Sequence, residues 1–336
     1  MLTKKIAFTT QSCTIYFAAA FSQLKKRCPQ KTTVLITDEN VFAAHQKKFK
    51  GWNTIVLKAG EEYKVQGTVD SIIEQLIQMH ADRTGTMAGV GGGVVTDMTG
   101  YAASVFLRGI TFGFVPTTLL GMVDAAIGGK NGIDVGLHKN MVGTIHQPHF
   151  ILYDVSFLKT LPDSEWRNGF AEVLKHAAIM DAILFKELEK RTISYFQKNK
   201  PALQRLVERN VLLKTKVVKE DEFEKGRRRI LNFGHTLGHA IEKQYELMHG
   251  EAVAIGMVFA AKLSAELVHF KGTDKIVRLI DQYGLPTTAG YNKAKAFDLL
   301  ISDKKREGEQ MNFILLEKIG KAVIKKISLP EIYKFI

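Results

Sequence analysis

The sequence of 336 residues contains only two cysteines, and its net charge is +13. Cys13 and Cys28 form no Cys-x-x-Cys pair, and two cysteines in a chain of this length exclude the disulfide framework of a small secreted protein. The lysines and arginines are scattered, and no short basic block is interleaved with aromatic residues, so we expect no nucleic acid partner. The positive charge instead favours a small anionic ligand, such as a phosphorylated or carboxylated molecule.

Long hydrophobic runs are also absent. The longest one, residues 252–267, is interrupted by Lys262 and Ser264, and it falls short of the roughly 20 apolar residues that cross a bilayer. Near the N-terminus, polar residues at positions 9–12 interrupt what would be the apolar core of a signal peptide. Together with the low cysteine count, these absences predict a cytoplasmic protein without a membrane partner.

The first half of the chain alternates short β-branched runs with helical segments. Residues 33–37, 54–57, 86–90 and 111–115 are predicted strands, and residues 69–79 have the apolar spacing of an amphipathic helix. Alternation of this kind indicates a largely parallel sheet with helices on its faces.

Beyond residue 162 the pattern becomes mainly helical. Helices are predicted over residues 170–188, 202–219, 235–247, 251–268 and 274–283. Near the C-terminus, two apolar runs predict a hairpin around Gly320. A length of 336 residues suits two domains. We therefore predict an α/β domain over residues 1–158 and a mainly α-helical domain over residues 159–336.

Three histidines lie within fifteen residues of the second half: His235, His239 and His249. On a helix, side chains four residues apart share one face, so His235 and His239 could reach one ligand, and His249 could fold back toward it. Imidazole is a common zinc ligand, but histidines at the ends of packed helices give the same spacing. Glu172 is a candidate partner, because it lies in an otherwise apolar stretch where an idle carboxylate would be costly.

A glycine-rich turn follows the predicted strand at residues 86–90. Its sequence is Gly89-Val90-Gly91-Gly92-Gly93-Val94-Val95-Thr96-Asp97. Backbone NH groups at such a helix start, with no Cβ nearby, can bind a pyrophosphate. The spacing differs from Gly-x-Gly-x-x-Gly, and a tight turn requires glycine in any case, so a dinucleotide site and a structural turn both remain open.

A second cluster of ligand-type side chains lies between residues 124 and 140. Gly128-Gly129-Lys130 lets the backbone approach a ligand and delivers a lysine to it, and Lys139-Asn140 follows nine residues later. Lysine and asparagine together suit a phosphate or a carboxylate. For each lysine taken alone, a surface position beside a turn is the simpler interpretation.

These segments together resemble one family, the 3-dehydroquinate synthases, within the superfamily of sugar-phosphate cyclases. The matching stretches run in order over residues 60–255, and residues 303–305 extend the match. They comprise residues 91–95, 101–103, 107–110, 115–120, 123–124, 128–130, 139–140, 160–162, 169–175, 231–240 and 249–253.

The resemblance implies an α/β, Rossmann-like N-terminal domain that binds NAD, a mainly α-helical C-terminal domain that carries one zinc or cobalt ion, and a homodimer. It assigns the metal to Glu172, His235 and His249, and it moves His239 to the substrate phosphate. The other residues that it implies for catalysis and substrate binding are Arg108, Asp124, Lys130, Asn140, Lys175, Lys214, Arg228, Asn232 and Lys305, with Lys304 as the alternative to Lys305.

Individual roles follow from the same resemblance. Lys214 and Arg228 would bind the substrate carboxylate, Asp124 and Lys175 would line the reaction centre, and Arg108 would reach the partner subunit's site. The implied NAD contacts are Glu61, Lys64, Gly93, Val94, Val95, Thr96, Asp97, Thr117, Thr118, Lys130, Lys139, Phe157, Leu158, Lys159 and Thr160.

The implied activity converts the sugar phosphate 3-deoxy-D-arabino-heptulosonate 7-phosphate to 3-dehydroquinate and phosphate, a step of the shikimate pathway. The alternatives are a sister cyclase of the 2-deoxy-scyllo-inosose or 2-epi-5-epi-valiolone synthase type and a metal-dependent polyol dehydrogenase. The substrates of the sister enzymes lack the carboxylate that Lys214 and Arg228 would bind. A dehydrogenase would accumulate NADH.

The sequence departs from the family pattern at the glycine-rich turn. Thr96 stands where the family usually has glycine, so the turn is expected to shift unless threonine can adopt the same backbone angles. Ala59 replaces a frequent aspartate, and the first forty residues show little of the family's pattern. These departures concern NAD affinity rather than the metal or the substrate.

Overall fold

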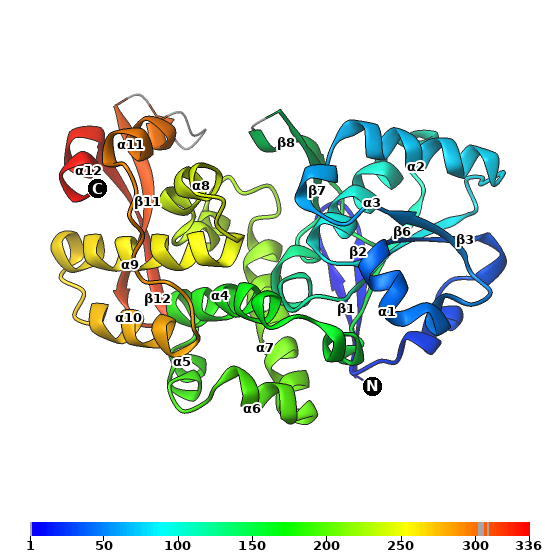
Figure 1. Cartoon of the computed structure of the whole chain (residues 1–336), viewed down its shortest axis with the longest axis horizontal. Coiled ribbons are helices and arrows are strands. Elements are labelled where there is room, and N and C mark those ends of the chain that lie inside the picture. The colour runs from blue at the N-terminus through cyan, green and yellow to red at the C-terminus, as the bar shows by residue number, and fades with distance from the viewer. Residues whose placement is uncertain (1, 137, 302–305, 308) are drawn as a thin grey trace. The chain divides into compact units, whose positions relative to one another are not determined.

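The structure, a computed structural model, describes residues 2–136, 138–301, 306–307 and 309–336 (Figure 1). It divides into two compact units, the first comprising Met1–Pro162 and Lys200–Phe223 and the second Asp163–Asn199 and Glu224–Ile336. The sequence-based boundary at residue 158 lies near the first crossing between the units. Residues Lys200–Phe223 belong to the first unit, which was not predicted from the sequence.

Unit 1 is built on a seven-stranded sheet with the order β1-β2-β9-β6-β5-β3-β4. The strands are β1 (Leu2–Ala7), β2 (Ser12–Phe17), β3 (Thr33–Asp38), β4 (Asn53–Leu57), β5 (Thr86–Gly91), β6 (Thr111–Pro116) and β9 (Phe150–Leu152). All neighbours pair in parallel except β1 and β2. The central strands β3, β5 and β6 are almost wholly buried, which explains their continuous apolar runs and confirms the predicted α/β class.

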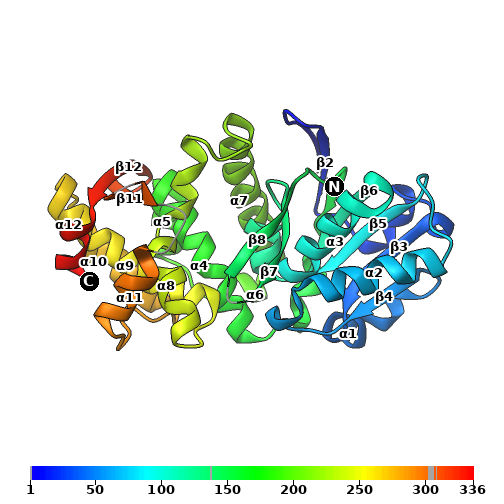
Figure 2. The ribbon, with the colours of Figure 1, turned by 90° about the horizontal axis from the view of Figure 1, so that it is seen from above.

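Helices cover this sheet along its strands (Figure 2). They are α1 (Glu39–Phe49), α2 (Gln66–Gln78) and α3 (Gly93–Val105). A further helix of unit 1, α7 (Lys200–Glu220), packs on the turn Gly121–Ala125. The chain runs from β3 to the edge strand β4 and then returns to β5 on the other side of β3. The carboxyl ends of β3 and β5 therefore flank a switch point, where parallel sheets usually bind their ligands.

A hairpin of β7 (Lys130–Val135) and β8 (His138–Ile145) forms a separate two-stranded sheet in unit 1. No strand was predicted here from the sequence, although residues 133–137 (Ile-Asp-Val-Gly-Leu) alternate apolar with other residues. The hairpin packs β7 against α3. It carries three of the predicted ligand-binding side chains: Lys130, Lys139 and Asn140.

Unit 2 is mainly helical, as predicted. Its helices are α4 (Asp163–Met180), α5 (Ala182–Leu188), α6 (Ile193–Lys198), α8 (His235–Gln244), α9 (His249–Val268), α10 (Thr273–Gln282), α11 (Lys293–Ile301) and α12 (Leu329–Phe335). The antiparallel strands β10 (Arg306–Glu307), β11 (Gln310–Lys318) and β12 (Lys321–Ser328) form a small sheet. The predicted hairpin around Gly320 is confirmed by β11 and β12.

Two helices end earlier than the apolar pattern suggests. The predicted helix over residues 170–188 is broken at Asp181, whose carboxylate accepts hydrogen bonds from the NH groups of Ile183 and Leu184, at 3.1 and 2.9 Å, and so caps α5. The helix predicted to reach residue 247 ends at Gln244, and Glu246 follows with a φ of 51°. No described helix is long and apolar enough to cross a membrane.

Candidate active site

The histidines of unit 2 are brought together by a close crossing of α8 and α9. A Cβ on Gly256 of α9 would lie 1.8 Å from the carbonyl oxygen of Gly234, which precedes α8, and one on Gly238 would lie 3.0 Å from the carbonyl of Ala252. Only glycine permits this approach. The first turn of each helix carries one of the histidines, His235 and His249.

The carboxylate comes from α4. The NH group of Gly250, next to His249, donates a 2.7 Å hydrogen bond to the side chain of Asn168, and this contact docks the start of α9 on α4. One helical turn beyond Asn168, Glu172 is fully buried. The buried Lys175, three residues further along α4, forms an ion pair with Oε2 of Glu172.

Glu172, His235 and His249 place their ligand atoms within 4.8 Å of one another. Oε1 of Glu172 lies 3.5 Å from Nε2 of His235 and 3.5 Å from Nε2 of His249. Two imidazoles and one carboxylate are a ligand set of catalytic zinc sites, in which a fourth position stays open. Burial lowers the pKa of His249, but hydrogen bonds to Glu172 and Glu242 outweigh it and raise the pKa to about 9. The three ligand atoms fit a divalent cation by their type and spacing, and a bound cation would displace the proton that His249 otherwise holds.

His239 lies beside this set. Its ring centroid is 5.2 Å from that of His235 and 6.3 Å from that of His249, and its side chain is exposed. The expectation that His235 and His239 share one face of a helix is thus met in α8. His239 also forms a second group of ligand atoms within 4.8 Å, together with Glu242 and His249. Glu242 was not predicted from the sequence, although a carboxylate beside the apolar Ile241 in an amphipathic segment is a detectable signal.

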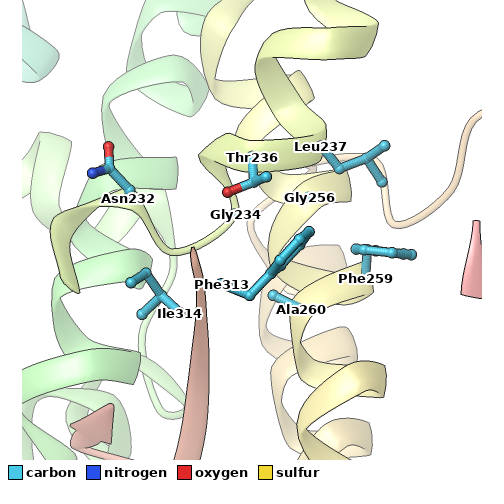
Figure 3. Close-up of a pocket in the computed structure, with 9 residues that line it drawn as sticks. All are labelled: Asn232, Gly234, Thr236, Leu237, Gly256, Phe259, Ala260, Phe313 and Ile314. Carbon is cyan, nitrogen blue, oxygen red and sulfur yellow. The ribbon is translucent and has the colours of Figure 1, made fainter. Parts of the chain in front are cut away.

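Two further predicted residues of unit 2 lie on the turn Arg227–Asn232 that precedes α8. Arg228 is buried, and Asn232 donates a 2.7 Å hydrogen bond to Glu224. Asn232 also borders a small pocket, whose other lining residues are Gly234, Thr236, Leu237, Gly256, Phe259, Ala260, Phe313 and Ile314 (Figure 3). This pocket carries no cationic side chain, so it does not suit a phosphate. Lys304 and Lys305 lie outside the described residues.

In unit 1, the glycine-rich turn joins β5 to α3 at the switch point. A Cβ on Gly91 would lie 2.5 Å from the side chain of Val95, so the turn requires glycine there. Thr96 lies within regular α3: its NH group bonds to Gly92 and its hydroxyl to the carbonyl of Gly93, at 3.0 and 2.9 Å. Because a helical backbone suits threonine, the turn does not have to shift to accommodate it.

Among the predicted NAD-binding residues, Lys64 contacts two others, Glu61 and Asp97. Its ammonium group lies 2.7 Å from Asp97 and 3.8 Å from Glu61, and it donates a 2.7 Å hydrogen bond to the side chain of Asn140. Lys139 approaches Glu61 at 3.9 Å. Burial lowers the pKa of Lys64, but these carboxylates outweigh it and raise the pKa above its ordinary value. The glycine-rich turn and the β7–β8 hairpin are thus joined through one buried cation.

A second ion pair in unit 1 joins residues ninety positions apart. Lys214 of α7 lies 2.8 Å from the carboxylate of Asp124 and donates a 2.9 Å hydrogen bond to the carbonyl of the same residue. Asp124 is on a short π-helical turn, Gly121–Ala125, which packs on α7. The return of α7 to unit 1 therefore produces this pair.

The remaining predicted residues occupy turns of unit 1. Thr117 and Thr118 follow β6, and Thr118 accepts a 3.0 Å hydrogen bond from the NH group of Gly121. The segment at residues 157–160 is a 3-10 turn in which Phe157 and Leu158 are buried, so these two could offer a dinucleotide only backbone groups. Arg108 is exposed at a φ of 66°, and Lys130 is exposed at the start of β7.

The comparisons with known proteins agree with this architecture. Residues 54–168 match the family model described as 3-dehydroquinate synthase N-terminal, and residues 169–306 match 3-dehydroquinate synthase C-terminal. The chain is 39% identical to 3-dehydroquinate synthase of Acetivibrio thermocellus, over 96% of this chain and 95% of that protein.

Solved structures of two related cyclases share the fold over nearly the whole chain. 2-Deoxy-scyllo-inosose synthase, solved with carbaglucose-6-phosphate, NAD+ and Co2+, is 25% identical with a TM-score of 0.86 and 99% coverage of both chains. 2-Epi-5-epi-valiolone synthase of Streptomyces hygroscopicus, solved with NAD+ and Zn2+, is 26% identical with a TM-score of 0.87, and the match covers 99% of this chain and 96% of that one. With its two halves matched in order and a relative 39% identical along its length, the chain belongs to the 3-dehydroquinate synthase family.

Proposed function

We propose that this protein is a 3-dehydroquinate synthase, which converts 3-deoxy-D-arabino-heptulosonate 7-phosphate to 3-dehydroquinate and phosphate. The observation that carries the proposal is the group formed by Glu172, His235 and His249, within 4.8 Å, in a chain of this family. The reaction oxidises a ring hydroxyl, eliminates phosphate, reduces the ketone again and closes the new ring by an aldol step. It has no net redox change.

The cofactors are NAD and one Zn2+ or Co2+. When bound, the metal supplies Lewis-acid stabilisation to the hydroxyl that loses its proton, and NAD accepts and returns the hydride. Glu172, His235 and His249 would hold the metal. The ammonium group of the buried Lys175 offsets part of the negative charge of Glu172. An anionic group of the substrate would therefore be repelled less at this site.

The substrate's two anionic ends are bound by different residues in this proposal. The buried Arg228 can hold a carboxylate through two parallel hydrogen bonds, which lysine cannot do, and Lys214 assists it. The phosphate is bound by Lys130, Asn140, Asn232, His239 and a C-terminal lysine. Asp124 lines the reaction centre. The NAD pyrophosphate binds at the start of α3, where the partly exposed Gly92 and Gly93 have no Cβ to keep a phosphate away from the backbone NH groups.

Phosphate release decides the assignment. Protein loaded with Zn2+ and NAD should release phosphate from 3-deoxy-D-arabino-heptulosonate 7-phosphate without accumulation of NADH. Parallel reactions contain glucose 6-phosphate, the oxygen-ring counterpart of the carbaglucose-6-phosphate in the neighbouring structure, and glycerol. No release from the heptulosonate refutes the proposal, faster release from glucose 6-phosphate indicates a sister cyclase, and NADH formed from glycerol indicates a polyol dehydrogenase.

We further propose a cytoplasmic homodimer in which Arg108 reaches the partner subunit's site. The support for this role is that Arg108 is exposed, on the turn that follows α3, where its φ is 66° and that of Gly109 is 115°. Sedimentation equilibrium tests the dimer. Mixing Arg108→Ala protein with a variant inactivated at Glu172 then tests whether a dimer with one intact site recovers activity.

A further inference from the structure

The imidazole of His249 lies between two carboxylates. Its Nε2 is 3.5 Å from Oε1 of Glu172, and its Nδ1 is 3.5 Å from Oε2 of Glu242. Glu242 belongs to α8, is 5% exposed, and lies seven residues before His249 in the chain. Glu242 is not one of the three proposed metal ligands. It contacts one of them, His249, on the side of the ring that faces away from Glu172.

His235 has the same arrangement with a different acceptor. Its Nε2 also lies 3.5 Å from Oε1 of Glu172, and its Nδ1 lies 3.2 Å from the carbonyl oxygen of Phe233. Both rings therefore present Nε2 to the same carboxylate oxygen and have an oxygen acceptor behind Nδ1. An acceptor at Nδ1 keeps the ring proton on that atom, which leaves the lone pair of Nε2 available for a metal.

We propose that Glu242 is a positioning residue for the metal ligand His249: its carboxylate holds the Nδ1 proton, fixes the ring with Nε2 toward Glu172, and strengthens Nε2 as a donor. This inference rests on the proposed metal site and adds a residue to it. Carboxylates behind ligating histidines orient the ring and raise its basicity, and their loss typically weakens metal binding by about 10–100-fold.

Glu242 is 5% exposed, and a buried carboxylate is costly unless it has a partner. The imidazole of His249, at 3.5 Å, is such a partner. Replacing Glu242 alone removes one partner of a buried pair, so the metal-free fold should lose stability rather than gain it. Zn2+ affinity is therefore measured on the folded protein, separately from thermal unfolding.

The test compares Glu242→Gln, Glu242→Leu and the wild type. Glutamine keeps an acceptor for Nδ1 without the charge, whereas leucine removes the acceptor. Zn2+ affinity is measured by competition with a chromophoric chelator, and the visible absorption of the Co2+-loaded protein reports the ligand field. Thermal unfolding of the metal-free proteins reports the fold. The control is Glu246→Gln, which removes the same charge from an exposed position four residues away.

We expect Glu242→Leu to lose about 10–100-fold in Zn2+ affinity with a shifted Co2+ spectrum, Glu242→Gln to lose less, and the control to match the wild type. The metal-free Glu242 variants should unfold at or below the wild-type temperature, so Zn2+ affinity is compared at a temperature where every variant is folded. Unchanged Zn2+ affinity and Co2+ spectrum in both variants would overturn the inference.

One further result would overturn it: two ions bound per wild-type chain, falling to one in both variants. Glu242 would then itself be a ligand of a second ion, together with His239 and His249. The Zn2+ affinities of the variants can be compared whether or not the protein releases phosphate from the heptulosonate. A failure of the proposed reaction can therefore be told apart from a failure of this inference.

Discussion

At the scale of single residues, the chemistry of unit 2 depends on buried charges that are held by specific partners. Glu172 is fully buried, and it lies between the cation of Lys175 and the rings of His235 and His249. Removing one member of such a group leaves the others as uncompensated buried charges, which is strongly destabilising. Residues at this site are therefore tested best by substitutions that keep size and change one property.

Arg228→Leu tests the recognition of the substrate carboxylate. A hydrogen bond to a charged group contributes about 1.5–3 kcal/mol, so kcat/KM for the heptulosonate should fall by roughly 10–150-fold, while the Kd of NAD stays unchanged. The exposed neighbour provides the control, because Arg227→Leu removes the same charge from the same turn. Equal losses of substrate and NAD binding in Arg228→Leu would show that the residue was assigned wrongly.

At the scale of elements, the crossing of α8 and α9 positions the metal ligands. Gly234, Gly238 and Gly256 allow the two helices to approach until backbone touches backbone, and the first residue of each helix is a histidine of the set. The end of α8 matters equally. The apolar pattern predicted that the next helix starts at residue 251. The chain instead turns at Glu246, with a φ of 51°, and α9 starts at His249.

Gly256→Ala should therefore disturb both stability and metal binding. A Cβ there would lie 1.8 Å from the carbonyl of Gly234, so the helices must separate, at a cost of about 1–3 kcal/mol. Urea unfolding and a Zn2+ titration measure the two effects. Gly67→Ala is the matched control, because a Cβ on Gly67 of α2 meets nothing within 4 Å; it should stabilise by up to about 1 kcal/mol. An unchanged Zn2+ affinity in Gly256→Ala would contradict the role of the crossing.

At the scale of the whole molecule, each unit carries a self-contained part of the predicted machinery. The metal ligands Glu172, His235 and His249 all belong to unit 2, although they lie in three different helices. The glycine-rich turn, Lys64 and its carboxylate partners all belong to unit 1. The helix α7 belongs to unit 1 as well, so Lys214 meets Asp124 there.

Ligands should therefore protect the two units separately from hydrogen exchange. At about 100 times its Kd, a ligand stabilises the state that binds it by about 2.7 kcal/mol, which slows exchange roughly 100-fold for amides exposed by opening of that site. Zn2+ should slow exchange in α4, α8 and the start of α9, and NAD should slow it in β5 and the start of α3. Mass spectrometry of peptic fragments measures both. Protection by Zn2+ confined to unit 1 would contradict the assignment of the ligands.

Local sequence patterns determined most of the secondary structure. The β-branched runs at β3, β4, β5 and β6 lie in strands within one residue of their predicted limits, because a buried parallel strand needs a continuous apolar run. In the helical half, the apolar spacing predicted the long helices α7, α9 and α10 to within two residues, but α4 begins seven residues earlier than predicted, and the short helices α6, α11 and α12 were not predicted. The break at Asp181 was not predicted, since the apolar period continues through it and only the capping geometry marks the end.

The sequence by itself also determined which side chains were candidates for a metal site, since the histidine spacing and the carboxylate within an apolar stretch are both local features. Only the tertiary structure decided which of them meet. Glu172 lies 63 and 77 residues before His235 and His249, and their approach depends on the glycines of the α8–α9 crossing and on Asn168. The partners Glu242 of His249 and Lys214 of Asp124 were decided in the same way. Contacts at such separations are set by how whole helices pack, which no local period encodes.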